Sequence, residues 1–109
     1  MIAPEQLEAL GAVCARAQVM NDAGIEFVYL EKLKVRSDEQ ALEIDALLRP
    51  GEYAGYTTRL FLSQPVPTKA NNWSIHQFLG RAWHTWSWQG VPADLPLIQM
   101  LMCHLDALR

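Results

Sequence analysis

Two stretches of the sequence carry apolar residues at the three- and four-residue spacing of an amphipathic helix. The first spans residues 4–20, where Pro4 suits the opening turn and residues 21–24 provide a stop. Its apolar stripe consists of Leu7, Leu10, Cys14 and Ala17. The second is predicted to be capped by Asp94 and to end at Arg109. Its stripe consists of Leu97, Leu101, Leu105 and Leu108.

Between these helices the pattern indicates β-strands. Residues 26–35 are rich in aromatic and β-branched types, and residues 57–63 resume that character after a turn at 49–52. Residues 41–48 alternate, with Glu43 and Asp45 on the polar face, where we expect both to be solvated. A loop is then predicted, because prolines and asparagines exclude a central strand. They are Pro65, Pro67, Asn71 and Asn72.

Together these elements predict a single α+β domain over residues 1–109. An antiparallel β-meander of three consecutive strands would be packed by an N-terminal and a C-terminal helix. Residues 73–88 hold all four tryptophans of the chain, and their pattern leaves open whether the segment begins as a strand or a helix. Residues 82–88 read as extended, with Gly80 interrupting the segment.

Charge and hydropathy exclude several function classes. Nine Lys and Arg against twelve Asp and Glu give a net charge of -3, which argues against nucleic-acid binding. No run approaches the roughly 20 apolar residues of a membrane-spanning helix. The N-terminus shows no secretory signal pattern, so a cytoplasmic location is expected.

Metal and cofactor chemistry find little support. Cys14 and Cys103 are far apart and fall on apolar helical positions, so we expect small buried side chains and no strong case for a disulfide. No close Cys or His pair has the spacing of a tetrahedral metal site. The Gly51–Gly55 stretch lacks the lysine of a phosphate-binding loop. The expectation is therefore no metal and no cofactor.

His84 is the strongest candidate for a catalytic base, because hydroxyls at Thr85 and Ser87 lie nearby in the sequence. The alternative is a histidine that is hydrogen-bonded within an aromatic layer. No Gly-x-Ser-x-Gly motif occurs, and neighbouring residues of an extended chain point to opposite faces. A hydrolase is therefore disfavoured.

The tryptophan cluster allows two interpretations. Indole faces stack on sugars, bases and cations, which makes a small-molecule or carbohydrate-binding module one candidate function. Core packing is the expected use of at least two of the four, which are Trp73, Trp83, Trp86 and Trp88. The many apolar residues of 73–91 are also consistent with a homodimer or a permanent partner.

Two segments, residues 80–88 and 97–105, resemble the prokaryotic family E of the ubiquitin-conjugating-enzyme superfamily. The resemblance extends upstream through residues 55–62 and the proline-bearing residues 63–67. It implies that fold for the whole chain, with its order of helix, strand meander, loop and helix.

Conjugating enzymes of this superfamily carry a cysteine after a glycine-containing turn and an asparagine in a His-Pro-Asn motif. Here Trp83 or His84 stands at the cysteine position, and no His-Pro-Asn occurs. The resemblance therefore implies a conjugating-enzyme-like protein without the thiol, which binds a ubiquitin-like protein, an adenylating activating enzyme and a metallopeptidase. His84 would replace the cysteine as a site residue. Partner contacts would come from Arg81, Trp83, Trp86 and Trp88.

Overall fold

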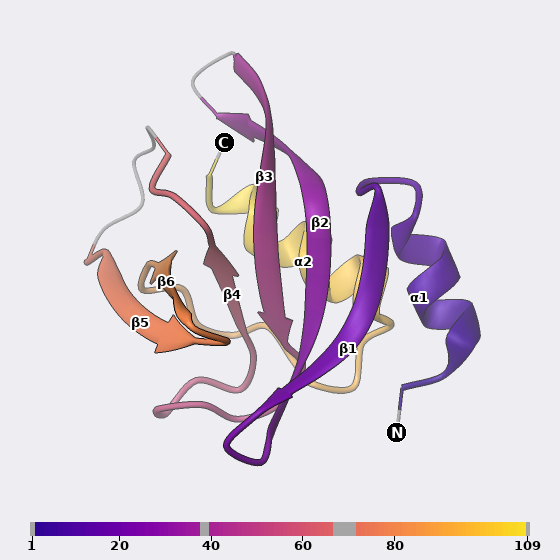
Figure 1. Ribbon diagram of the computed structural model, residues 1–109, viewed down its shortest axis with the longest axis horizontal. Helices are drawn as coiled ribbons and strands as arrows, with labels where there is room; N and C mark the ends of the chain where they lie inside the picture. Colours follow the sequence, from indigo (N-terminus) through magenta and orange to yellow (C-terminus); the bar gives the residue numbers. More distant parts are fainter. Residues whose placement is uncertain (1, 38–39, 67–71, 109) are drawn as a thin grey trace.

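The computed structural model describes residues 2–37, 40–66 and 72–108 as an α+β domain. Its elements are α1 (Pro4–Leu10), β1 (Arg16–Asp22), β2 (Ile25–Ser37), β3 (Gln40–Arg49), β4 (Arg59–Leu62), β5 (Ser74–Phe78), β6 (Arg81–Thr85) and α2 (Leu97–Asp106) (Figure 1). The strands form one antiparallel sheet in the order β1-β2-β3-β4-β6-β5. The three predicted strands, β2 to β4, are confirmed as neighbours within this larger sheet.

The first helix is shorter than its apolar spacing predicts. It ends at Leu10, and residues 16–22 form β1, so the expected helix is wrong beyond that point. The reason lies in Ala23 and Gly24, whose φ angles of 52° and 83° provide the two left-handed residues of a type I′ hairpin turn. That turn folds β1 back onto β2, and tertiary pairing overrides the local helical spacing.

A second tight turn of the same kind organises the tryptophan-rich segment. Leu79 and Gly80, with φ of 53° and 76°, join β5 and β6 as a hairpin. The segment whose structure the sequence left open is therefore two strands. Pro65 and Asn72 lie between β4 and β5 as predicted, while Pro67 and Asn71 lie outside the described residues.

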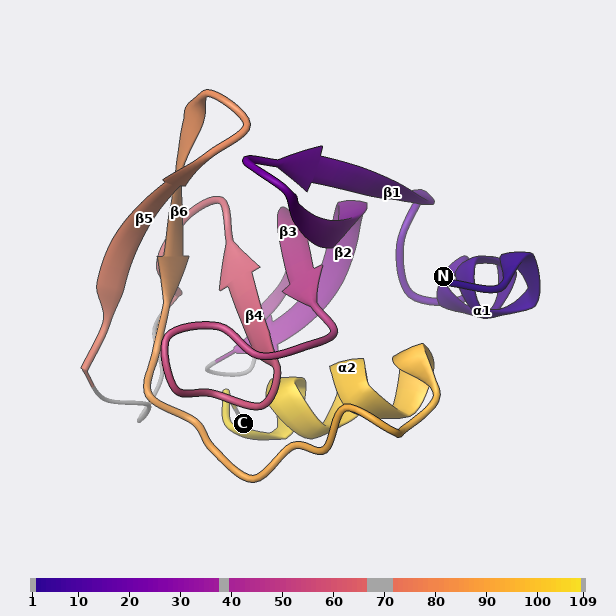
Figure 2. The same ribbon diagram turned by 90° about the horizontal axis from the view of Figure 1, so that it is seen from below.

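The sheet curls strongly, so that its two ends approach one another (Figure 2). The Leu79 N–H, at the tip of the β5–β6 hairpin, donates to Asp22 Oδ2 at the end of β1, 2.6 Å away. This curl gives the sheet an outer, convex face and an inner, concave face. Apolar side chains occupy both.

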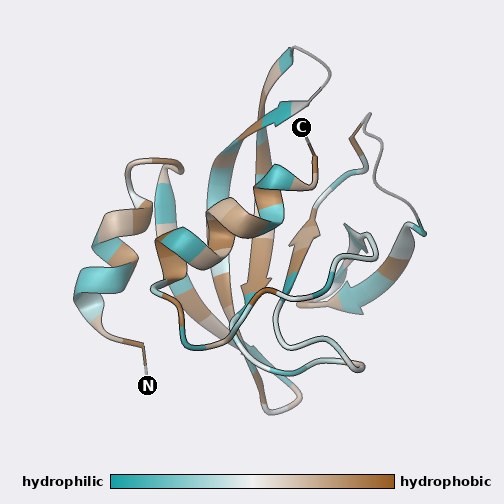
Figure 3. Ribbon diagram, turned by 180° about the vertical axis from the view of Figure 1, so that it is seen from behind, coloured by the Kyte–Doolittle hydropathy of each residue, from teal (hydrophilic) through white to brown (hydrophobic). Residues whose placement is uncertain are grey.

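The outer face is covered by α2, which lies across the sheet (Figure 3). We call the buried aliphatic cluster between them the outer core. It includes Val28, Leu30, Leu33, Leu48, Leu60, Leu62, Met100 and Leu101. At the start of α2, the Leu97 N–H is capped by Gln6 Oε1 from α1, 2.7 Å away, and not by the expected Asp94. The helix ends at Asp106, and Arg109 lies outside the described residues.

The inner face encloses a smaller, mostly aromatic cluster, which we call the inner core. It consists of Phe27, Leu47, Phe61, Phe78 and Trp83. The rings of Phe27 and Phe78 are 4.7 Å apart between centroids, which joins β2 to the hairpin across the curl. Rings pack in tilted and edge-on pairs, the arrangements that aromatic quadrupoles favour.

Candidate functional site

Three of the predicted site residues lie on β6, where alternation divides them between the two faces of the sheet. Arg81 and Trp83 point to the inner face, and His84, one residue on, points to the outer face. The sequence proposal placed them in one site. The structure instead gives the hairpin two chemically different surfaces.

Trp83 forms the base of the inner surface. Its side chain is fully buried, and its Nε1–H donates to the Phe78 carbonyl oxygen at 3.0 Å. The guanidinium carbon of Arg81 lies 4.7 Å from the Trp83 ring centroid, and Tyr29 packs edge-on against the indole at 5.7 Å. Trp83 therefore supports two polar side chains and has no face left for a ligand to stack on.

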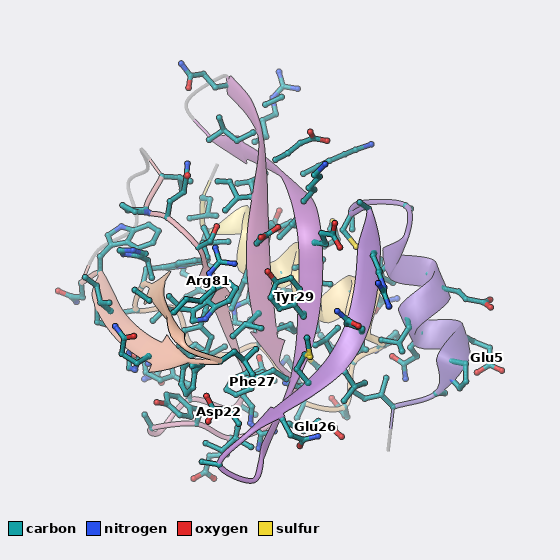
Figure 4. All side chains as sticks on the ribbon, in the orientation of Figure 1. Glu5, Asp22, Glu26, Phe27, Tyr29 and Arg81 are labelled. Carbon is teal, nitrogen blue, oxygen red and sulfur yellow. The ribbon has the colours of Figure 1, made fainter. Side chains whose placement is uncertain are left out.

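A polar network connects the hairpin with β2 and β3, and Figure 4 shows two of its members, Arg81 of β6 and Tyr29 of β2. Arg81 Nη1 donates to the Tyr29 hydroxyl oxygen at 3.0 Å and approaches Asp45 Oδ2 at 3.4 Å. The Tyr29 hydroxyl in turn donates to Asp45 Oδ2 at 3.0 Å. The Arg81 side chain is 43% exposed, so solvent screens this ion pair and weakens it.

Asp45 is positioned by a β-bulge in β2. Glu31 and Lys32 together oppose the single residue Asp45, and Lys32 takes a φ of 53°. In this conformation the Lys32 N–H donates to Asp45 Oδ1 at 3.0 Å. Asp45 lies on the polar face as expected but is only partly solvated, since its side chain is 28% exposed and its carboxylate accepts hydrogen bonds from Lys32, Tyr29 and Arg81. Glu43 is exposed as expected.

The protonation states in this network are fixed near neutral pH. Burial alone would raise the pKa of Asp45, but hydrogen bonds from Lys32, Tyr29 and Arg81 outweigh it and leave that pKa below its usual value. Burial, with the neighbouring Asp45, raises the pKa of the Tyr29 hydroxyl. A carboxylate that stays charged and a phenol that stays protonated suit binding and positioning better than general acid–base catalysis.

His84 lies on the outer surface of the hairpin, opposite Ile75 of β5 and Leu62 of β4. Within the described chain its ring has no hydrogen-bond partner that would orient it as a base. Its cross-strand neighbour Ile75 is 62% exposed. His84 thus lies between a buried leucine and an exposed isoleucine.

The remaining tryptophans do not share a surface with Trp83. Trp86 is buried in the outer core against the half-buried Trp73, with ring centroids 5.2 Å apart. Trp88 is 41% exposed beyond the end of β6. The predicted binding residues Trp83, Trp86 and Trp88 thus lie in the inner core, in the outer core and on the surface.

Both cysteines are free and lie away from the hairpin. Cys14 is buried between α1 and β1, where its Sγ–H donates to the Leu10 carbonyl at 3.2 Å and burial raises the pKa of its thiol. Cys103 lies half-buried on α2. Across the ranges that the structure describes, no three His, Cys, Asp or Glu side chains form a group able to hold a metal ion.

No protein family model, curated protein or solved structure matches the chain. None of the helices in the described ranges has the length and hydropathy needed to cross a membrane.

Sequence reasoning missed Tyr29, Asp45 and Ile75 as site residues. Only Asp45 left a signal, because the apolar positions of β2 that face the outer core run 28, 30, 33 and 35. The shift by one position indicates the bulge that faces Asp45.

Proposed function

We propose that this chain is a conjugating-enzyme-like binding domain without a catalytic thiol, which acts in the cytoplasm within a bacterial ubiquitin-like modification system. Its role would be non-covalent protein–protein contact. Its partners would be a ubiquitin-like protein and an adenylating activating enzyme, with a metallopeptidase that reverses the modification. The resemblance of residues 80–88 and 97–105 to prokaryotic family E motivates the identity of these partners.

The observation that carries a binding role is the outer surface of the β5–β6 hairpin. Ile75 is 62% exposed there, beside His84. A partner that covered this side chain would gain the free energy of burying its apolar surface. The helix that seals the outer face elsewhere packs against β4 and α1, so within the described residues nothing buries Ile75.

The position of β5 also favours a protein partner. This strand ends the sheet order, so one side of its backbone is unpaired within the described sheet. An extended segment of another protein can add to such an edge by main-chain hydrogen bonds, with pockets or apolar contacts giving specificity. We therefore place the partner's extended tail along β5, in contact with Ile75 and His84.

Burial supports binding over covalent transfer. Of Trp83 and His84, the two candidates for the position of the thiol in conjugating enzymes, Trp83 is fully enclosed. Thiolate chemistry needs an accessible, low-pKa cysteine, and Cys14 has the opposite properties. For the small-molecule alternative, the buried Trp83 and Trp86 offer no exposed ring face, which leaves Trp73 and Trp88 as its stacking candidates.

The test is affinity capture by the tagged full chain from its host's lysate with ATP, with and without reductant, read by mass spectrometry. We expect recovery of an adenylating enzyme or a ubiquitin-like protein, and at least a tenfold loss of that recovery in Ile75→Asp. Because Ile75 is exposed, this variant should fold normally, which circular dichroism checks. Trp88→Ala is the matched control, since it removes a second exposed apolar side chain outside the hairpin.

Equal recovery by wild type and Ile75→Asp would overturn the proposed face, and recovery of neither protein would overturn the proposed pathway. Loss of the complex under reductant would show a thiol linkage and overturn the non-covalent role. If wild type sediments as a dimer and Ile75→Asp as a monomer, the partner on β5 is a second copy of this chain.

A further inference from the structure

Arg59, the first residue of β4, is a buried cation without an anionic partner. Only 6% of the residue is exposed. No carboxylate among the described residues forms an ion pair with it, and its Nε is enclosed without a hydrogen-bond partner. Buried charges in proteins are normally paired and hydrogen-bonded, because desolvation of an isolated charge is costly.

Aromatic rings offset part of this cost but do not satisfy the buried Nε–H. The Arg59 Cζ lies 3.9 Å above the Tyr56 ring centroid and 6.0 Å from that of Phe61. Ring faces attract the charge but accept no conventional hydrogen bond from its five N–H groups.

The polar groups around Arg59 are neutral. The Tyr53 hydroxyl is hydrogen-bonded to His76 Nδ1 at 3.3 Å, and the Tyr56 hydroxyl donates to Ser87 Oγ at 3.2 Å. Burial, followed by the positive charge of Arg59, lowers the pKa of His76. The cluster therefore has an uncompensated positive charge surrounded by hydroxyl groups and a neutral imidazole.

We propose that Arg59 anchors an anion-binding site for a single carboxylate or phosphate group, beside Tyr53, Tyr56 and His76. The planar guanidinium presents paired N–H donors that match the oxygen atoms of either anion. Neighbouring hydroxyls supply further donors by rotating toward a bound oxyanion. This site does not depend on the partner proposed for β5, since Arg59 points to the inner side and Ile75 to the outer side.

Arg49 provides an internal control. It lies directly opposite Arg59 in the β3–β4 register, but its side chain donates to the carbonyl oxygens of Glu26 and Glu52, at 2.9 and 3.3 Å. Two of its five N–H groups, including Nε–H, are therefore used within the protein. The two arginines of the same sheet region thus differ at Nε, which is hydrogen-bonded in Arg49 and enclosed without a partner in Arg59.

The experiment titrates the full chain with inorganic phosphate and, separately, with sodium acetate, at constant ionic strength set by sodium chloride. Amide chemical shifts in a two-dimensional NMR spectrum give both the affinity and the location. We expect saturable shifts centred on residues 53–60 with at least one of the two anions. Saturation by phosphate alone identifies a phosphate site, and saturation by acetate alone identifies a carboxylate site.

The matched variants are Arg59→Gln and Arg49→Gln. We expect at least a tenfold weaker affinity in Arg59→Gln and less than a twofold change in Arg49→Gln. Absence of saturable shifts with both anions in wild type, or shifts centred on Arg81, would overturn the proposal. These wild-type outcomes decide the question even if Arg59→Gln does not fold.

Discussion

The two faces of the curled sheet are packed in different ways. The outer core is mostly aliphatic and is sealed by α2, and within it the buried Thr58 and His104 are hydrogen-bonded to each other. The inner core is aromatic, and charged side chains such as Asp45 and Arg81 gather at its open edge. The part of the outer face that α2 covers serves stability, whereas a face closed only by curvature can also present polar groups to a ligand.

The largest loss of stability should come from a substitution in the inner core, because this core holds only five buried residues in the described chain. We expect Trp83→Ala to lower the free energy of unfolding by about 3–5 kcal/mol. The change leaves a cavity, removes the hydrogen bond to Phe78, and withdraws the support of Tyr29 and Arg81. Equilibrium urea unfolding measures it.

Leu101→Ala is the equivalent truncation in the outer core, where a Leu→Ala change lowers the free energy of unfolding by about 2–5 kcal/mol. Trp88→Ala, on the surface, should stay within about 0.5 kcal/mol of wild type. A loss below about 1 kcal/mol in Trp83→Ala would mean that the inner cluster is not a packed core.

The next largest effect is a pH dependence of the unfolding free energy, which comes from His104 in the outer core. The Thr58 hydroxyl donates its proton to the Val91 carbonyl, so His104 Nε2–H must donate to Thr58, at 2.9 Å. Burial, with the charge of Arg59, lowers the pKa of His104 to about 4. The ring is therefore neutral in the folded protein and becomes protonated more easily when unfolded.

Because the folded pKa lies below the unfolded value of about 6.5, this contribution to stability is complete above pH 6.5 and is lost as the pH falls toward 4. The expected loss is about 3 kcal/mol over that interval. Urea unfolding at several pH values should show it, and His104→Gln should flatten the slope. The lowered pKa of His76 makes a smaller contribution of the same sign to this pH dependence of stability. The lowered pKa of Asp45 affects stability only at more acidic pH.

Much of the outer core could be predicted from the sequence, because it depends on local periodicity. The alternation in residues 41–48 and the stripe through Leu97, Leu101 and Leu105 correctly gave β3, α2 and their buried faces. Periodicity failed at β1, where residues at helical spacing pair with β2 instead. The Ala-Gly turn after β1 was the overlooked signal, since it fits a hairpin as well as a helix end.

The inner core could not be predicted in the same way. A strand assignment for residues 81–85 would have placed Arg81 and Trp83 on one face. Their meeting with Tyr29 of β2 depends on the curl of the whole sheet, which is a property of all six strands together. The unpaired state of Arg59 depends equally on non-local packing, and its sequence context contains no signal of it.

The smallest expected change in stability concerns the two type I′ turns, of which one is exposed and one packs against the inner core. Ala23 and Leu79 both have φ near 50°, a region that asparagine tolerates better than other non-glycine residues. Ala23→Asn should raise the unfolding free energy by about 0.5 kcal/mol, seen as a rise in thermal midpoint of about 2–4 °C. Leu79→Asn should gain less or lose stability, because Leu79 also packs against the inner core.

Ala23→Val is the opposite control, since a β-branched residue is strained at this φ and should lower the midpoint. Equal midpoints for Ala23→Asn and Ala23→Val would contradict a left-handed turn at the end of β1.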